Sequence, residues 1–165
     1  MIVLAGFMGA GKTTVGRLLA DKLGIPFLDS DQVIEERSGR AIRDIFAADG
    51  EAAFRELEHQ AIAGLLAGPP AVLALGGGAA GHPGTRDLLI SSSAADVVYL
   101  RVGYEEALAR VGGDTGRPML ARDDIAHVYA ARQEMYAAVA ALTVDTDGRA
   151  PEDIASDILT RIPAA

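Results

Sequence analysis

A chain of 165 residues, of which 50% are apolar and 23% charged, has the size and composition of one globular domain with a buried core. The absence of cysteine excludes disulfides and thiolate metal sites, and the net charge of −8 argues against nucleic acid as a partner, because phosphate backbones need a basic face. No apolar run reaches the ~18 residues of a membrane span, and the first residues are typical of a core strand and not of a signal peptide, so a cytoplasmic protein is expected.

Short apolar runs alternate with segments of helical periodicity. In chain order, the continuous apolar runs predict buried strands at residues 2–5, 26–29, 71–75, 96–100 and 142–145. Apolar side chains at helical spacing predict helices at residues 12–23, 51–66, 104–111, 123–141 and 151–162. Strands separated by helices indicate βαβ units, so we expect an α/β fold of three layers, with a doubly wound, five-stranded parallel sheet. A single domain over residues 1–165 is the simplest organisation.

Two segments interrupt this alternation. After Asp31, short helical pieces fill more chain than a crossover needs, and we expect the region of about 31–60 to be a substrate-binding insertion. The region of about 111–123 holds three glycines and a proline with little periodicity, which is typical of a mobile lid. Both segments are therefore candidate parts of a functional site.

A phosphate-binding loop follows the first predicted strand. Residues 6–13 read Gly-Phe-Met-Gly-Ala-Gly-Lys-Thr and match G-x-x-x-x-G-K-[ST] between a strand and a helix. The glycines let several backbone N–H groups converge on one phosphate, and the helix N-terminus adds partial positive charge. Lys12 is expected to reach the β- and γ-phosphates, and the Thr13 hydroxyl to join a Mg²⁺ shell. The expected ATP contacts from this motif are Gly9, Ala10, Gly11, Lys12, Thr13 and Thr14.

The motif alone fits a kinase, a GTPase switch or an ATPase motor. A GTPase switch also needs an N-K-x-D element that reads the base, and this chain contains no asparagine. The composition therefore disfavours the GTPase class.

Two carboxylates close the second predicted strand, in Asp29-Ser30-Asp31. Residues i and i+2 of an extended chain share a face, so both side chains can point at the ligand crevice beside the phosphate loop. One carboxylate suits the outer shell of Mg²⁺, and the other suits a substrate hydroxyl whose proton must leave. A polar turn, with Ser30 or Asp31 as the N-cap of the next helix, explains the same residues, and the two interpretations are compatible.

Three consecutive glycines, Gly76–Gly78, follow the third predicted strand. Because three glycines are costly to order, we expect this backbone to approach a ligand closely.

Taken together, these motifs resemble the shikimate kinase family, in the nucleoside-monophosphate-kinase-like branch of P-loop proteins. The resemblance covers essentially the whole chain, because many short motifs match in the same order. Besides the phosphate loop and Leu28–Asp31, the matching segments are Ile34–Gly39, Ile42–Phe46, Asp49–Glu51, Phe54–Glu58, Leu75–Gly78, Arg110, Arg117–Leu120, Arg132 and Tyr136.

The resemblance implies transfer of a phosphoryl group from ATP to a hydroxyl of shikimate, giving shikimate 3-phosphate in the pathway to aromatic amino acids. It implies Asp29 near Mg²⁺ through water, and Asp31 on the substrate hydroxyls as the base. Arg55 and Arg132 are implied to clamp the substrate carboxylate, a task that suits the planar guanidinium. The Gly77 N–H is implied to meet the substrate or the γ-phosphate. The implied substrate site is Asp31, Arg55, Gly76, Gly77, Gly78 and Arg132.

The nucleotide side follows from the same resemblance. Arg117, on the lid, is implied to contact ATP and to neutralise charge on the transferring phosphoryl group. Adenine is implied to lie between Arg110 and the loop near Arg149 and Pro151. Small residues in that loop, such as Gly148, depart from the family pattern and leave base selectivity open. The implied catalytic set is Lys12, Asp31 and Arg117.

Two other functions stay open on the sequence. A related sugar-acid kinase of the gluconate type also takes an acceptor with a carboxylate and hydroxyls, although the spacing of the aspartates and the arginine pair favour a cyclic acid. A nucleotide-binding module without catalysis fits the phosphate loop, but the filled catalytic positions disfavour it. The expected partners are ATP and shikimate, with Mg²⁺ as cofactor and neither nucleic acid nor membrane. A monomer is expected, because no apolar helix face is left over.

Overall fold

The computed structural model describes residues 1–112 and 124–162 of the chain. Its centre is a five-stranded sheet in the order β2-β3-β1-β4-β5. All neighbouring strands run parallel, so the chain crosses over between them through helices. The predicted α/β fold with a doubly wound parallel sheet is confirmed. The strands are β1 (Ile2–Ala5), β2 (Phe27–Asp29), β3 (Val72–Ala74), β4 (Asp96–Arg101) and β5 (Leu142–Asp145).

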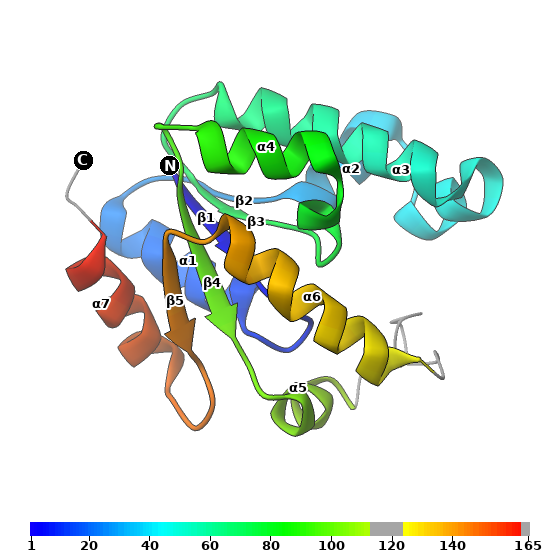
Figure 1. The fold of residues 1–165 in the computed structure, drawn as a ribbon. Helices are drawn as coiled ribbons and strands as arrows, with labels where there is room; N and C mark the ends of the chain where they lie inside the picture. The colour runs from blue at the N-terminus through cyan, green and yellow to red at the C-terminus, as the bar shows by residue number, and fades with distance from the viewer. Residues whose placement is uncertain (113–123, 163–165) are drawn as a thin grey trace.

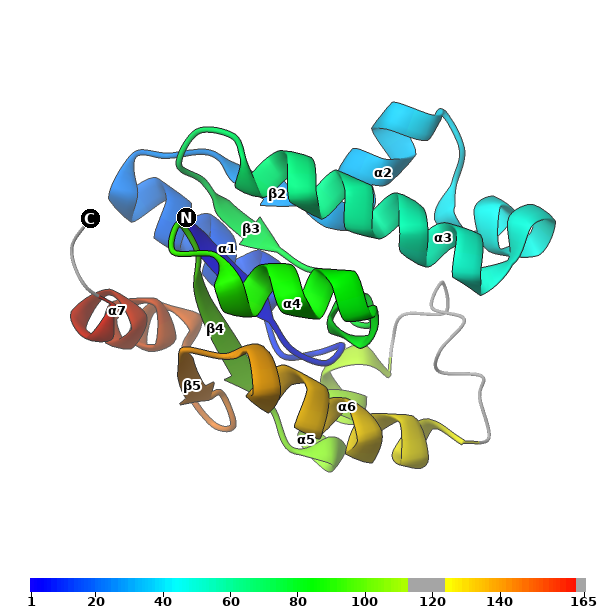
Figure 2. The same ribbon diagram turned by 45° about the horizontal axis from the view of Figure 1, so that its top comes forward.

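Helices cover both faces of the sheet (Figures 1 and 2). On one face, α1 (Lys12–Leu23) and α7 (Pro151–Arg161) pack together. The other face is covered by α3 (Ile42–Leu66), α4 (Pro83–Ser91) and α6 (Ile125–Val139). This double cover explains why the strands read as continuous apolar runs and not as alternating ones.

Smaller elements gather where the strands end. α2 (Ser30–Ser38) begins directly after β2 and packs on α3. A 3-10 turn, η1 (Ala79–Gly81), follows the glycines after β3, and α5 (Tyr104–Val111) follows β4. Because parallel strands all end at the same edge of a sheet, these elements meet around one crevice.

The cap of α2 differs from the prediction. Asp29 is the N-cap, and its Oδ1 accepts from the N–H of Asp31 at 2.9 Å and of Gln32 at 3.4 Å. The prediction of Ser30 or Asp31 as the cap is wrong, because the backbone stays extended through Asp29 and turns helical at Ser30. The side chain of Asp31 is therefore not used for capping.

The largest differences from the predicted helices are in α3 and α4, whereas α6 and α7 differ from the prediction only at their ends. α3 starts at Ile42 instead of residue 51, because two helical segments join at Gly50, which has φ 83° and ψ 172°. Apolar periodicity does not predict α4, whose first turn holds Pro83 and Gly84. The side chain of His82 caps α4 by accepting from the N–H of Thr85 at 3.2 Å, and proline is well suited to the first helical position.

Candidate active site

The phosphate loop joins β1 to α1 in a conformation that depends on glycine. Gly9 and Gly11 have φ of 78° and 90°, in the left-handed region that side chains rarely adopt. A Cβ at Gly9 would also lie 2.8 Å from the carbonyl oxygen of Ala107 in α5. Gly11 is the N-cap of α1 and has no side chain that could occupy the first N–H groups of the helix. Those N–H groups and the helix dipole favour a phosphate at this place.

Lys12 lies across the loop that precedes it. Its Nζ donates to the carbonyl oxygens of Gly6 at 2.7 Å and Phe7 at 3.1 Å. Its charge also acts on Asp31, because the ammonium partly offsets the raised pKa of that carboxyl. Lys12 thus contacts the phosphate loop and is close enough to Asp31 for its charge to act on that carboxyl. The side chains of Thr13 and Thr14, which follow it at the start of α1, are exposed.

Ser30 connects the end of β2 to the glycines after β3. Its side chain is fully buried, and its Oγ accepts from the N–H of Gly76 at 2.9 Å. Sequence reasoning considered Ser30 only as a cap and missed this contact. A serine between two acidic residues carries no local sign of a partner 46 positions further along the chain.

Two carboxylates flank Gly76. A Cβ at this glycine would lie 2.5 Å from Oε1 of Glu58 and 2.6 Å from Oδ1 of Asp31. Burial raises the pKa of Asp31 to about 6, and the negative charges of Glu58 and Asp29 add to the rise. Asp31 is therefore a carboxyl that exchanges its proton close to neutral pH, as suits a general base.

Arg55 is fixed next to Gly78 by an ion pair. Its Nη1 donates to Oε2 of Glu58 at 2.5 Å, and its Cζ lies 5.2 Å from the centre of the Phe54 ring. Glu58 is only 1% exposed, and within the described residues its Oε1 has no hydrogen-bond partner. Burial raises the pKa of Glu58, while Arg55 opposes the rise. A Cβ at Gly78 would lie 2.5 Å from Cζ of Arg55, so the guanidinium occupies the space that a side chain would fill.

Arg132 and Tyr136 approach Gly77 from α6. The Tyr136 hydroxyl donates to the Gly77 carbonyl oxygen at 2.6 Å, and burial raises the pKa of Tyr136. A Cβ at Gly77 would lie 3.0 Å from Nη1 of Arg132, whose Cζ is 5.9 Å from the centre of the Phe7 ring. α6 thus places one guanidinium next to the glycines and anchors their backbone one turn later.

Each glycine makes room for a different charged side chain. Gly76 faces Asp31 from α2, Gly77 faces Arg132 from α6, and Gly78 faces Arg55 from α3. The sequence predicted close approach of this backbone to a ligand, and that approach stays a prediction. The structure adds a reason for the glycines, since three elements bring their side chains to three consecutive positions.

A cavity of about 380 Å³ lies on the other side of the phosphate loop, between α5 and the loop before α7. Its wall includes the residues expected around adenine. The predicted nucleotide contacts that line it are Gly9, Ala10, Gly11, Thr14, Arg110, Arg149 and Pro151.

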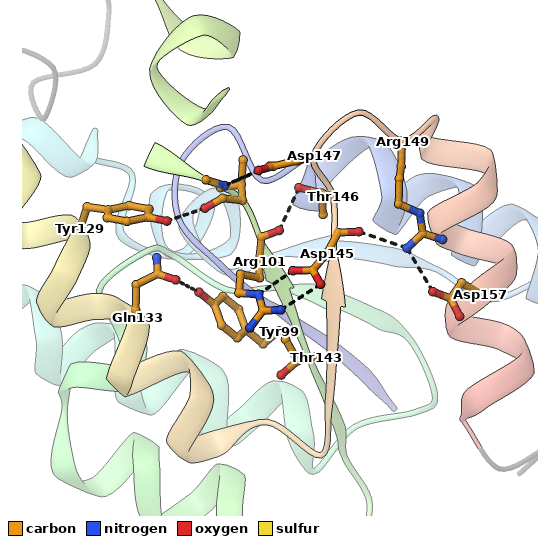
Figure 3. Close-up of polar contacts among 12 residues, drawn as sticks. Tyr99, Arg101, Tyr129, Gln133, Thr143, Asp145, Thr146, Asp147, Arg149 and Asp157 are labelled. Carbon is orange, nitrogen blue, oxygen red and sulfur yellow. Dashed lines mark hydrogen bonds and ion pairs between the residues drawn. The ribbon is translucent and has the colours of Figure 1, made fainter. Parts of the chain in front are cut away.

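The two arginines of this cavity are held in place by hydrogen bonds to neighbouring residues. Arg110 donates to the carbonyl oxygens of Gly9 at 3.1 Å and Thr146 at 2.9 Å. Arg149 donates to the carbonyl oxygen of Asp145 and to the Asp157 carboxylate, both at 3.1 Å (Figure 3). The cavity is therefore bounded by two guanidinium groups in fixed positions, each of which is paired with a carboxylate. The sequence did not predict a role for Thr146, because a threonine in a turn gives no sign that an arginine such as Arg110 binds it.

The residues predicted to hold Mg²⁺, Thr13 and Asp29, carry oxygen donors of the kind that this ion takes. Thr13 carries an exposed hydroxyl at the start of α1, and the Asp29 carboxylate closes β2. In residues 1–112 and 124–162, no group of three or more His, Cys, Asp and Glu is arranged to hold a metal ion. A Mg²⁺ ion that takes most of its ligands from nucleotide phosphates and water needs no such group. The predicted lid from residue 113 onward, with Arg117, lies outside the described residues.

Comparison with known proteins gives the family. A family model described as shikimate kinase matches residues 8–163. The chain belongs to the shikimate kinase family. A shikimate kinase of Thermobifida fusca is 46% identical over 168 residues, which cover 100% of this chain and 96% of the relative. One of Mycobacterium avium is 44% identical over 166 residues, which cover 98% and 93%.

Solved structures agree with this membership. The shikimate kinase of Acinetobacter baumannii in complex with shikimate superposes with a TM-score of 0.89 at 40% identity, covering 96% of this chain and 90% of that chain. The shikimate kinase of Aquifex aeolicus gives 0.83 at 34%, covering 96% and 94%. A gluconokinase of Sinorhizobium meliloti gives 0.58 at 20% identity, covering 96% and 89%, and shares the fold alone. Membership in the shikimate kinase family disfavours both the gluconate-type kinase and the non-catalytic module.

Proposed function

We propose that this chain transfers the γ-phosphoryl group of MgATP to a hydroxyl of shikimate, giving shikimate 3-phosphate and ADP in the pathway to aromatic amino acids. One observation carries the proposal. Two guanidinium groups and the half-buried carboxyl of Asp31 stand at three consecutive glycines, and one of the guanidinium groups, that of Arg132, also lies near Phe7 of the phosphate loop. A ring acid with several hydroxyls matches this arrangement. Its carboxylate needs positively charged partners, its reacting hydroxyl needs a negatively charged one, and the ring holds the two groups at a fixed separation.

The residues divide the reaction between them. Arg55 and Arg132 hold the acceptor carboxylate, and Asp31 accepts the proton of the attacking hydroxyl. A bond forms between that hydroxyl oxygen and the γ-phosphorus, the bond from the γ-phosphorus to the β–γ bridging oxygen breaks, and ADP leaves. Lys12 neutralises charge on the β- and γ-phosphates, which accumulates as the reaction proceeds.

The remaining assignments belong to the same proposal. Thr13 and Asp29 hold Mg²⁺, Asp29 through water, and the ion when bound screens the phosphate charges. Arg117 contributes a further positive charge from the lid, about 111–123. Region 31–60 binds the acceptor, and the enzyme is a cytoplasmic monomer of one domain. None of the helices in residues 1–112 and 124–162 combines the length and the apolar character needed to cross a membrane.

Calorimetric titration of the purified protein with shikimate and with gluconate tests the function, together with a coupled assay of ADP release. We expect shikimate to bind, and to raise ADP release well above the rate seen with ATP alone. If the protein preferred gluconate, gluconate would replace shikimate as the proposed acceptor. Nucleotide binding without turnover on either acid would indicate a non-catalytic module.

The pH dependence of the reaction should follow Asp31. The carboxyl accepts a proton only when ionised, and its pKa is raised to about 6. We therefore expect kcat/KM for shikimate to fall about tenfold for each pH unit below about pH 6, and to be level above it. Initial rates at saturating MgATP between about pH 5 and about pH 8 measure this, with urea unfolding at each pH as a control for acid denaturation. A flat profile across that range would remove Asp31 as the base.

Gly78→Ala should weaken shikimate binding, at a cost in stability no greater than that of losing the ion pair between Arg55 and Glu58. Gly78 has φ −104° and ψ −1°, which alanine adopts freely, but the new Cβ would displace the Arg55 guanidinium from Glu58. Loss of a charge-assisted contact predicts a KM for shikimate about 10- to 100-fold higher, with an unchanged KM for ATP. Gly64→Ala is the matched control, because its Cβ would meet only Nη1 of Arg37 at 3.6 Å. If Gly78→Ala and Gly64→Ala had the same KM for shikimate, shikimate binding would not depend on the position of the Arg55 guanidinium beside Glu58.

A further inference from the structure

Thr146 is a fully buried residue in the loop between β5 and α7, and it contacts β4 and α5 without lining the cavity itself. Its N–H and its hydroxyl both donate to the carbonyl oxygen of Arg101, at 2.9 Å and 3.1 Å. Figure 3 shows this contact at the end of β4, next to the side chains of Asp147 and Arg149. The loop that follows β5 is thereby fastened to the neighbouring strand.

The same hydroxyl also meets Arg110. Nη1 of Arg110 donates to Oγ1 of Thr146 at 3.3 Å, and Nη2 donates to its carbonyl oxygen at 2.9 Å. A hydroxyl has one proton, which is used on Arg101, so the side that faces Arg110 is an acceptor. A guanidinium has donors only, and an acceptor at this place therefore suits it.

Through Arg110, the contact reaches the phosphate loop. Nη1 of Arg110, which meets the Thr146 hydroxyl, also donates to the Gly9 carbonyl oxygen at 3.1 Å, while Nε donates to Glu106 at 3.0 Å. Gly9, Glu106 and Arg110 all line the cavity. The position of this guanidinium is thus set by the phosphate loop, by α5 and by the loop after β5.

We propose that Thr146 is a positioning residue for nucleotide binding, whose hydroxyl holds the Arg110 guanidinium against the phosphate loop. The inference rests on the proposed function in one respect, namely that the cavity holds the nucleotide base. It assigns Thr146 no contact with the nucleotide. Threonine suits the task because its branched side chain has few rotamers, so the hydroxyl stays directed at both partners.

Thr146→Val tests the inference, because valine keeps the branched shape and removes the hydroxyl. An apolar methyl group would then face the guanidinium. We expect the Kd for ADP and the KM for ATP to rise about tenfold, the size of one hydrogen bond to a charged group. The KM for shikimate and kcat should stay within about twofold, while Thr146→Ser should restore nucleotide affinity. Calorimetry with ADP and initial-rate kinetics measure these values.

Thr85→Val is the matched control. Thr85 is also fully buried, and its hydroxyl lies 3.1 Å from Nδ1 of His59, remote from the nucleotide cavity. This variant should leave the Kd for ADP unchanged. If Thr85→Val and Thr146→Val lost ADP affinity equally, removing any buried threonine hydroxyl would lower ADP affinity by reducing protein stability. That result would overturn the inference.

A double-mutant cycle decides whether Thr146 acts through Arg110. In an Arg110→Ala background, Thr146→Val should change the Kd for ADP by less than about twofold, because the partner of the hydroxyl is gone. A tenfold effect that persists in this background would overturn the inference. So would a wild-type Kd in Thr146→Val. Thr146→Ala, which cannot clash, is measured in parallel with the same expectation in case the valine variant does not fold.

The ADP titration needs no acceptor, so the two proposals can fail separately. If the cycle shows coupling but the wild-type enzyme does not phosphorylate shikimate, the acceptor assignment fails and the role of Thr146 stands. If the wild-type enzyme phosphorylates shikimate and Thr146→Val binds ADP normally, only the inference fails.

Discussion

Asp31→Asn is expected to lower turnover by about 10²-fold or more while MgATP binding stays nearly intact. The asparagine side chain has the same shape, but it cannot accept the proton of the attacking hydroxyl. Single-turnover kinetics with shikimate measure the loss, and calorimetry with a non-hydrolysable ATP analogue measures the binding. Turnover close to that of the wild-type enzyme would show that the reaction needs no base at this position.

The same substitution should make the protein more stable at neutral pH. The pKa of Asp31 is raised by folding, so the native state binds this proton more tightly than the unfolded state does. The contribution of Asp31 to stability therefore falls as the pH rises from about 4 to about 6, and stays low above that range. Removing the charge should raise the free energy of unfolding at pH 8 by about 1–3 kcal/mol.

Urea unfolding at about pH 8 and about pH 4 separates this effect from a general change. The gain of Asp31→Asn should be present at the higher pH and largely absent at the lower one, where the wild-type carboxyl is also neutral. Asp87→Asn, on the exposed surface of α4, is the matched control and should change neither turnover nor stability. A variant that is inactive and also less stable at both pH values would point to misfolding instead of a missing base.

Arg132→Ala is expected to weaken shikimate binding by about 2–4 kcal/mol, the usual result of removing one partner from a buried charge pair. Arg55→Ala should weaken it by a similar amount. Both guanidinium groups stand at the glycines after β3, but they come from different helices and have different neighbours. Calorimetric titration of each variant with shikimate measures the loss, while the Kd for ADP should stay unchanged.

The two arginine variants should differ in stability. Arg55 forms an ion pair with Glu58, which is 1% exposed, whereas Arg132 acts on Glu58 only through a weaker charge effect and lies near the Phe7 ring. Arg55→Ala leaves a buried carboxyl without its ion pair and should cost about 3 kcal/mol of stability, which Arg132→Ala should not. Adding Glu58→Gln to Arg55→Ala should recover much of the stability and none of the shikimate affinity.

Arg43→Ala is the control for both variants, because the Arg43 side chain is 81% exposed on α3. It should change neither shikimate affinity nor stability. Unchanged shikimate affinity in both Arg55→Ala and Arg132→Ala would remove the carboxylate clamp from the proposed function, and with it the reason to favour an acid as the acceptor.

Local patterns were enough to predict the order of the elements and the nucleotide loop. Apolar runs and helical spacing are properties of neighbouring residues, so β1, β5, α1 and α5 have the predicted bounds. The P-loop motif is equally local, because its glycines, lysine and threonine act within one turn of chain. Local patterns did not predict α4, because its start depends on a histidine cap and a proline, and both residues also occur in turns.

By itself, the sequence determined the alternation of strands and helices, the phosphate loop and the resemblance from which the charged residues were assigned. Only the tertiary structure decided why Gly76, Gly77 and Gly78 are glycines, why Ser30 is buried, and what the hydroxyl of Thr146 contacts. These facts depend on contacts between residues far apart in the chain. An arginine on a helix or a threonine in a turn has the same local sequence pattern whether its side chain faces solvent or a partner. Which of these occurs is decided only when α2, α3, α5 and α6 come together at one edge of the sheet.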